Sequence, residues 1–177
     1  MKQFASGHAM QSAWVVDDLD AAVDSWLKVG VGPFFFVEYT AELFENTTYR
    51  GSPSPISMKI ALAQAGDMQI ELIEPTGEQK NIYRDTVPEG TTAFHHLCYW
   101  SDDIDAEIAS LVAQGYEVAA TGQVAGGGAT FAYVDTSPVL GHMTELLTYS
   151  DDIKGLFDMV AAASIDWDGS NPKRRLG

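Results

Sequence analysis

The sequence predicts an α+β fold made of two βαβββ modules followed by a C-terminal helix. An Asp-Asp-apolar-Asp-Ala motif occurs twice, at residues 17–21 and 102–106. The two copies are 85 positions apart in a chain of 177 residues. Each copy follows a strand pattern and precedes a helix pattern. Similarity at a fixed offset of this kind is typical of a duplicated structural unit.

The first strand of each module is predicted at residues 10–16 and 96–100. In both segments side chains alternate between two faces, and β-branched and aromatic residues are frequent, as is typical of strands. A helix follows each strand, because apolar residues recur at intervals of three and four. The stripes are Leu19, Ala22, Val23, Trp26 and Leu27 in the first helix, and Ile104, Ile108, Leu111 and Val112 in the second.

Both helices have similar boundaries in the sequence. Asp18 and Asp103 are predicted N-caps, since a carboxylate accepts hydrogen bonds from the free backbone N–H groups at a helix start. Gly30 and Gly115 follow the last apolar positions and are expected to end the helices.

Three further strands complete each module. They are predicted at residues 34–39, 57–64 and 67–74, and at 116–119, 130–135 and 143–149. Residues 44–55 are expected to be an irregular insertion outside the sheet, because Pro53 and Pro55 exclude a central strand. The chain is thus predicted to be a single domain: module one at about 7–75, a linker at about 76–92, module two at about 93–149, a helix at about 151–164 and a loose tail.

Composition excludes several functional classes. The chain has 10 Lys and Arg against 25 Asp and Glu, a formal net charge of −15, which disfavours binding to nucleic acid or to an anionic membrane. Its single cysteine, Cys98, excludes an intramolecular disulfide framework and a cysteine-rich zinc site. We find no apolar run of signal-peptide or membrane-helix length, so we expect a soluble cytoplasmic protein.

The order of the motifs resembles that of the vicinal oxygen chelate superfamily. The relevant segments are the first strand with DDLDAAV, the segment AFHHLCYWSDDIDA, and the strand endings QIELIEP and MTELLTY. The superfamily includes glyoxalase I, methylmalonyl-CoA epimerase, extradiol dioxygenases and bleomycin-resistance proteins. The resemblance spans about residues 7–149. It implies an open, glyoxalase-like β-barrel with a metal and a small-molecule substrate on its concave side, and a homodimer.

The resemblance also implies a metal site. In the superfamily each module gives two ligands. One lies seven residues before the helix-capping Asp, which corresponds to Gln11 and His96 here. The other is the Glu of the E-apolar-apolar strand ending, which corresponds to Glu71 and Glu145. The first position is more often His, but Gln stands there in animal-type glyoxalase I. One imidazole, two carboxylates and an amide carbonyl suit a divalent ion such as Zn²⁺, Ni²⁺, Co²⁺, Mn²⁺ or Mg²⁺.

This ligand set favours a lyase or isomerase that removes an α-proton from a carbonyl compound through a metal-stabilised enolate. Glu145 is the first candidate for the base and Glu71 the second. One alternative is a metal-free binding or sequestering protein of the bleomycin-resistance type. A ring-cleaving dioxygenase is disfavoured, because the set lacks two histidines with one carboxylate.

Each residue also has a simpler interpretation. Glu71 and Glu145 could be solvent-facing edge carboxylates, His96 a core histidine bonded to the backbone, and Gln11 a polar residue lining a pocket without metal. By strand alternation His95 should face away from His96, as a structural or solvent-facing residue.

The aromatic content of the strands predicts an apolar pocket. Its expected lining comprises Ala13, Cys98, Trp100, Phe131 and Tyr133. His8 is expected to face away from Gln11, and His142 is a candidate acid or base at the pocket rim. Because the strands carry few cations, we expect a small apolar or aromatic carbonyl substrate and not a coenzyme A ester.

Overall fold

The computed structural model describes residues 7–77 and 80–176, and both predicted modules are present in it. The first contains β1 (Ala9–Val15), α1 (Leu19–Lys28), β2 (Phe34–Tyr39), β5 (Met58–Ala65) and β6 (Met68–Pro75). The second contains β7 (Ala93–Ser101), α3 (Ile104–Ala113), β8 (Glu117–Val124), β9 (Thr130–Asp135) and β10 (Met143–Thr148). The remaining elements are η1 (Ala41–Leu43), β3 (Phe44–Tyr49), β4 (Ser52–Pro53), α2 (Tyr83–Thr86), α4 (Ser137–Leu140), α5 (Asp151–Ser164) and β11 (Lys173–Arg175).

One mixed sheet contains all of the described strands, in the order β11-β2-β5-β6-β1-β7-β10-β9-β8-β3-β4. At its centre β1 pairs antiparallel with β7, and each has a parallel partner on its other side, β6 or β10. The order then continues outward as β5-β2 in one half and as β9-β8 in the other, so the two modules have the same internal arrangement. The predicted α+β fold of two βαβββ modules with a C-terminal helix is confirmed, and the sheet is open.

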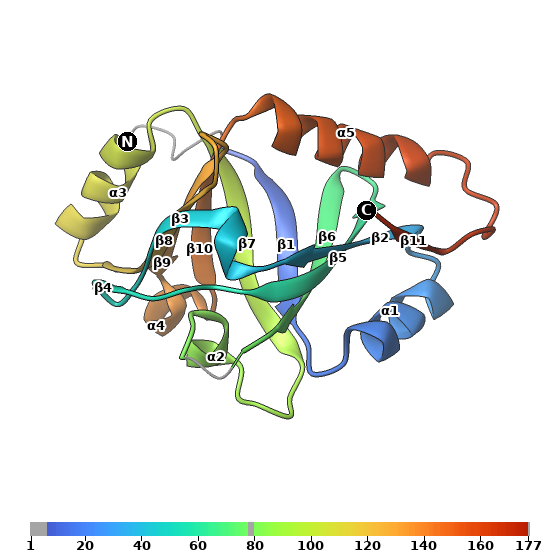
Figure 1. Cartoon of the computed structure of the whole chain (residues 1–177), viewed down its shortest axis with the longest axis horizontal. Helices are drawn as coiled ribbons and strands as arrows, with labels where there is room; N and C mark the ends of the chain where they lie inside the picture. Colours follow the sequence, from blue (N-terminus) through green and yellow to red (C-terminus); the bar gives the residue numbers. More distant parts are fainter. Residues whose placement is uncertain (1–6, 78–79, 177) are drawn as a thin grey trace.

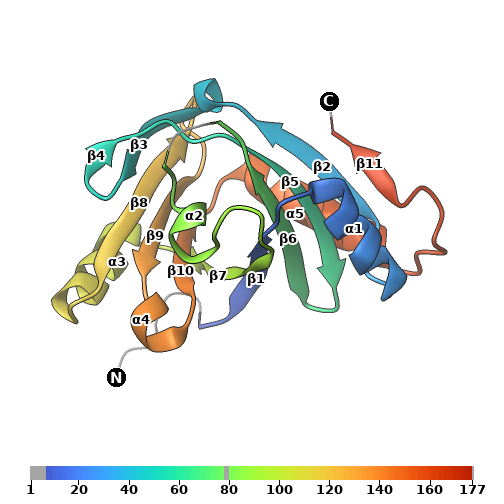
Figure 2. The same ribbon diagram turned by 90° about the horizontal axis from the view of Figure 1, so that it is seen from below.

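The sheet bends into an arch that has helices on its outer flanks and at both ends of its concave side (Figures 1 and 2). On the outer face α1 packs against module one through Leu19 and Val23, and α3 packs against module two through Leu111. The inner core includes Tyr83 of α2 and Val160 of α5. The arch therefore encloses a space between α2 and α5, and the candidate site lies there.

Local sequence signals explain how the two outer helices begin. Asp18 Oδ1 accepts a hydrogen bond from the Ala21 N–H at 2.9 Å, and Asp103 Oδ1 accepts one from the Ala106 N–H at 3.1 Å. Both residues are the predicted N-caps. No helix in the described parts of the chain is long and apolar enough to cross a membrane.

The prediction that residues 44–55 lie outside the sheet is wrong, because β3 and β4 both belong to it. β3 crosses from module one to pair antiparallel with β8 of module two. Phe44 packs against Tyr39 and Phe131, with ring centroids 5.4 and 5.8 Å apart, and these contacts explain why the segment joins the sheet. Pro53 still has the expected effect, since β4 is only two residues long and lies at the free edge.

The tail expected to be loose also joins the sheet, because β11 pairs in parallel with β2. The guanidinium groups of Arg174 and Arg175 lie 5.3 and 5.4 Å from the ring centroids of Phe35 and Phe36. Lys173 Nζ is 3.0 Å from Asp20 Oδ1. The cations near the C-terminus thus attach the tail to module one.

Candidate active site

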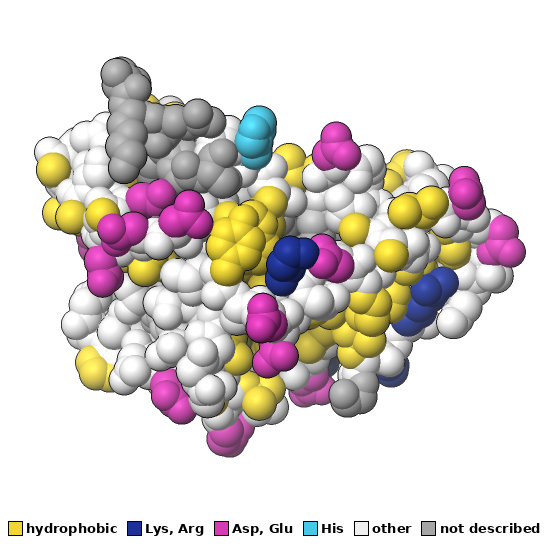
Figure 3. Space-filling model, turned by 90° about the horizontal axis from the view of Figure 1, so that it is seen from above, with side chains coloured by type: hydrophobic (Ala, Val, Ile, Leu, Met, Phe, Trp, Pro, Cys, Tyr) yellow, Lys and Arg dark blue, Asp and Glu magenta, His cyan; other side chains and the backbone are white. Residues whose placement is uncertain are grey.

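An apolar cavity occupies the concave side of the arch. It encloses about 610 Å³ of empty space up to its open mouth, and α5 contributes Ile153 and Phe157 to its wall. Its other apolar lining includes Phe44, Met58, Ile60, Leu62, Phe131 and Leu147. Figure 3 looks onto the side that carries α5, where scattered acidic side chains interrupt the apolar surface. A cleft with an apolar lining and a few polar groups is typical of sites for small organic molecules.

A glycine shapes one wall of the cavity. Gly122 of β8 is the register partner of Phe131 in β9. A Cβ atom at position 122 would lie 2.4 Å from Phe131 Cζ, so only glycine lets the ring lie flat against β8. The Phe131 ring can therefore form part of the cavity wall.

Three of the predicted site residues lie together at this cavity: Glu71 and Glu145 line it, and His96 is fully buried beside them. Ala13 of β1 is the register partner of His96 in β7 and of Glu71 in β6. Register partners lie on the same face of a sheet, so His96 and Glu71 both face the concave side with Ala13. Glu145 of β10 is the register partner of Cys98. His96 Nε2 lies 3.0 Å from Glu145 Oε2 and 3.6 Å from Glu71 Oε2.

The two carboxylates share an environment that is unfavourable for negative charge. Burial first, and then the charge of Glu145, raise the pKa of Glu71 well above its usual range. Among the described residues that line the cavity there is no Lys or Arg. The site thus combines two acidic groups with no positively charged side chain in its wall.

Gln11, the fourth predicted ligand, faces the same cavity. Its Nε2 donates a hydrogen bond of 2.7 Å to Oε1 of Gln69, and both amides are buried. Because the nitrogen makes this bond, the amide oxygen of Gln11 is the atom available to a cation. The sequence analysis missed Gln69, although it lies two residues before Glu71 and alternation places both on one face.

His95 is fully buried, which agrees with the structural interpretation and excludes the solvent-facing one, but it does not face away from His96 as alternation predicts. The register between β1 and β7 shifts at this point, with Ala13 opposite His96 and Trp14 opposite Phe94, which leaves His95 as the extra residue of a β-bulge. A bulge disrupts strict alternation, and here it brings the rings of His95 and His96 together, with Nδ1 atoms 2.9 Å apart. His95 Nε2 lies 3.2 Å from the Ile82 carbonyl oxygen.

The predicted pocket residues occupy different depths. Phe131 and Tyr133 line the cavity, whereas Ala13 and Cys98 are completely buried in the inner core. Burial first, and then the nearby Glu145, raise the pKa of the Cys98 thiol, which disfavours a nucleophilic thiolate. Trp100 stacks on Tyr149 at a centroid distance of 4.4 Å and is not part of the cavity lining.

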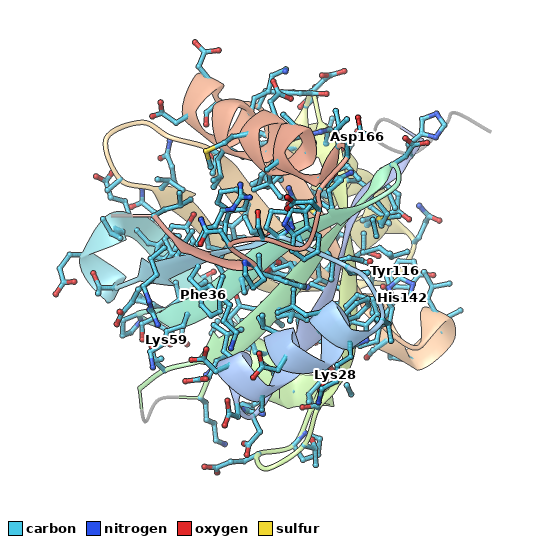
Figure 4. The ribbon with its side chains drawn as sticks, turned by 90° about the vertical axis from the view of Figure 1, so that its right-hand side faces the viewer. Lys28, Phe36, Lys59, Tyr116, His142 and Asp166 are labelled. Atoms are coloured by element: carbon cyan, nitrogen blue, oxygen red, sulfur yellow. The ribbon has the colours of Figure 1, made fainter. Side chains whose placement is uncertain are left out.

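The other two histidines lie outside the cavity lining. His8 is exposed. His142 Nδ1 is 2.7 Å from the carbonyl oxygen of Met143, and its ring packs against Phe94. Figure 4 places His142 at the periphery, next to α4. A role for His142 at the pocket rim has no support in this placement.

Two tyrosines in the cavity wall were not among the predicted residues. Burial first, and then the charge of Glu71, raise the pKa of Tyr39 to about 12. Tyr83 forms a side-chain hydrogen bond with Tyr133. Both Tyr39 and Tyr83 line the cavity and stay protonated, so they can donate hydrogen bonds there. Alternation in β2 could have identified Tyr39, but Tyr83 lies in the linker, where the sequence carries no signal.

Within residues 7–77 and 80–176, no three or more His, Cys, Asp or Glu side chains are already arranged around a metal position. One buried atom nevertheless fits a cation. His96 Nε2 is fully enclosed and has no hydrogen-bond partner of acceptable geometry among the described residues, although Glu145 Oε2 is only 3.0 Å away. An unsatisfied imidazole nitrogen near two carboxylates, with an amide in the wall of the same cavity, has the donor chemistry of a divalent-metal site.

Comparison with known proteins identifies the family. Residues 10–133 match the family model of the Glyoxalase/Bleomycin resistance protein/Dioxygenase superfamily. The chain belongs to this superfamily. No curated protein sequence matches the chain.

Solved structures agree with membership of the superfamily at the level of fold. A Streptomyces coelicolor methylmalonyl-CoA epimerase variant in complex with 2-nitronate-propionyl-CoA is 18% identical, with a TM-score of 0.55 over 84% of this chain and 99% of that one. A methylmalonyl-CoA epimerase in complex with methylmalonyl-CoA and NH4+ is 20% identical, with a TM-score of 0.53 over 80% and 93%. The Mycobacterium tuberculosis methylmalonyl-CoA epimerase is 17% identical, with a TM-score of 0.54 over 82% and 89%.

The raised pKa of Glu71 leads to a prediction for the chelator-treated protein. A carboxyl whose pKa is higher in the folded state binds more protons when folded, so stability should fall as pH rises above the ordinary carboxyl range. Glu71→Gln removes this charge and should stabilise the protein at pH 8 by about 1–3 kcal/mol. Urea unfolding between pH 5 and pH 8 measures both effects.

The matched control for Glu71→Gln is Glu38→Gln, which changes an exposed carboxylate on β2. A surface change of this kind should alter the free energy of unfolding by no more than about 0.5 kcal/mol. If the free energy of unfolding changes with pH equally in the wild type and in Glu71→Gln, the raised pKa assigned to Glu71 is contradicted.

Proposed function

We propose that the protein is a metal-dependent isomerase or lyase that moves the α-proton of a small, uncharged, apolar or aromatic carbonyl compound. The observation that supports this most directly is the cluster of His96, Glu71 and Glu145 at an apolar cavity. A carboxylate can act as a general base when it lies within reach of the proton that it removes. Glu145 and Glu71 both line the cavity that would hold the substrate.

Gln11, Glu71, His96 and Glu145 are the residues that would hold the ion. A divalent ion bound there supplies Lewis-acid polarisation of a substrate carbonyl. Glu145, on β10, removes the α-proton. Glu71 lies 3.6 Å from the same imidazole nitrogen that Glu145 approaches at 3.0 Å, so it can return a proton to the substrate from a neighbouring position. Two carboxyl groups with these separate roles suit an isomerase.

The wall of the cavity supports the choice of substrate class. Its side chains are mainly apolar, and Tyr39 and Tyr83 offer neutral hydroxyl donors to a carbonyl oxygen. Arg50 cannot serve as an anion anchor, because it is engaged with Asp85 at 2.7 Å, Asp135 at 2.7 Å and Glu117 at 3.0 Å. Two of the similar structures are methylmalonyl-CoA epimerases in complex with coenzyme A esters, but the net charge of −15 disfavours so anionic a ligand here.

Metal analysis combined with proton exchange tests the proposal. Protein purified without chelators should carry close to one divalent ion per chain. In D₂O it should introduce deuterium at the α-carbon of at least one member of a panel of apolar aldehydes and ketones, as followed by NMR. Chelation should stop the exchange and added metal should restore it. Exchange confined to a coenzyme A ester would overturn the proposed substrate class.

A second candidate function is metal-free binding of an apolar molecule. The observation that favours it is the absence, among the described residues, of a ready-formed group of three acidic, His or Cys ligands next to a well-formed apolar cavity. Protein that retains no metal in metal-replete medium and yet binds apolar compounds tightly would support this function instead.

A further inference from the structure

His95 is a fully buried histidine that the proposed mechanism does not use. It is the bulged residue of β7 and directly precedes His96. Its Nε2 lies 3.2 Å from the Ile82 carbonyl oxygen. A carbonyl oxygen can only accept a hydrogen bond, so the His95 proton sits on Nε2.

The other ring nitrogen of His95 faces His96. His95 is fully buried against the rings of Tyr83, Tyr133 and His96, where a charge on its ring would be costly, so the ring is neutral. With its proton on Nε2, a neutral His95 presents a lone pair at Nδ1. The two Nδ1 atoms are 2.9 Å apart, a distance that requires one proton between them. That proton must belong to His96 Nδ1.

With Nδ1 of His96 engaged by His95, Nε2 is the nitrogen of the His96 ring that remains for another partner. This is the nitrogen that lies near both Glu71 and Glu145. It is buried and has no hydrogen bond of acceptable geometry in the described structure, although Glu145 Oε2 is 3.0 Å away. The opposite tautomer would place an N–H at this position and block a cation.

We propose that His95 is a positioning residue that, with the Ile82 carbonyl, fixes the tautomer of His96 so that its Nε2 is free to bind a cation. The chain of contacts runs from the linker backbone through His95 to His96 and ends beside the cavity. Partners of this kind hold metal-binding imidazoles in the correct tautomer and typically change metal affinity by about 10–100-fold. The metal part of the proposal rests on the proposed function, whereas the tautomer part does not.

Ring NMR of the full chain tests the tautomer directly. In ¹⁵N-labelled, chelator-treated protein at neutral pH, long-range ¹H–¹⁵N correlation distinguishes protonated from unprotonated ring nitrogens. The signals are assigned by substituting each of the four histidines in turn. We expect His96 to carry its proton on Nδ1. His95→Phe removes the acceptor and should shift His96 towards the Nε2–H form.

Metal affinity provides the second measurement, with Zn²⁺ and Mn²⁺ as probes. His95→Phe should weaken binding by about 10–100-fold. His95→Asn keeps an acceptor oxygen near the place of Nδ1 and should restore both the tautomer and most of the affinity. His142→Phe is the matched control, because it removes another histidine with a backbone contact but lies outside the cavity.

The possible outcomes separate this inference from the proposed function. A wild-type His96 with its proton on Nε2 overturns the inference even if His95→Phe does not fold. An unchanged tautomer in a folded His95→Phe also overturns it. The expected tautomer in a protein that binds neither metal supports the role of His95 and contradicts only the proposed function.

Discussion

Glu145→Gln is expected to slow α-proton exchange by about 10²–10⁴-fold, the usual contribution of a general base. An amide of nearly the same shape can still offer an oxygen to a cation, but it cannot accept the proton. The side chain is 9% exposed and lies in a well-paired strand, so the fold should persist. The measurement is the rate of deuterium incorporation into the best carbonyl probe at matched metal content.

The control for Glu145→Gln is Glu74→Gln on β6. Glu74 accepts a hydrogen bond from the Leu19 N–H at 2.9 Å, pairs with Lys59 and is not part of the cavity wall. Its replacement should leave the exchange rate unchanged. If Glu145→Gln keeps full activity while Glu71→Gln abolishes it, the roles assigned to the two carboxylates are reversed.

The repeated motifs made the fold predictable, because each is a local signal. Asp18 and Asp103 set the helix starts through contacts three residues away, which can be read directly from the sequence. The strands β3 and β11 were missed because their partners are distant in the chain. β3 belongs to module one by sequence and pairs with β8 of module two, and no local pattern predicts that choice.

The four candidate ligands were predicted from the resemblance to a known superfamily, and three of them, Gln11, Glu71 and Glu145, line the cavity. Strand alternation predicted that His95 faces away from His96, and this is wrong because a β-bulge breaks the alternation at that residue. Strand alternation also cannot show which segments of the chain pack against a face of the sheet. The linker residue Ile82, which contacts His95, comes from a segment with no strand or helix pattern of its own.

His96→Ala should abolish stabilisation of the protein by divalent metal. A ligand at 100 times its Kd stabilises the folded state by about 2.7 kcal/mol. In a chain of this size that corresponds to a rise in Tm of roughly 5–10 °C. His96 supplies the only nitrogen of the four proposed ligands, and its Nε2 is the buried atom that lacks a partner in the described structure. Without it, the two carboxylates and one amide should bind metal too weakly to raise Tm at the same concentration.

The measurement is Tm with and without Zn²⁺ or Mn²⁺ for each variant separately. Comparison within one variant cancels the cost of the space left by the missing imidazole, which would otherwise lower Tm in both conditions. His142→Ala is the matched control and should keep the full rise, because His142 lies at the periphery. A His96→Ala protein that gains as much Tm from metal as the wild type would show that metal binds elsewhere. The carboxylates in the cavity wall would then need another explanation, such as a cationic group carried by the ligand itself.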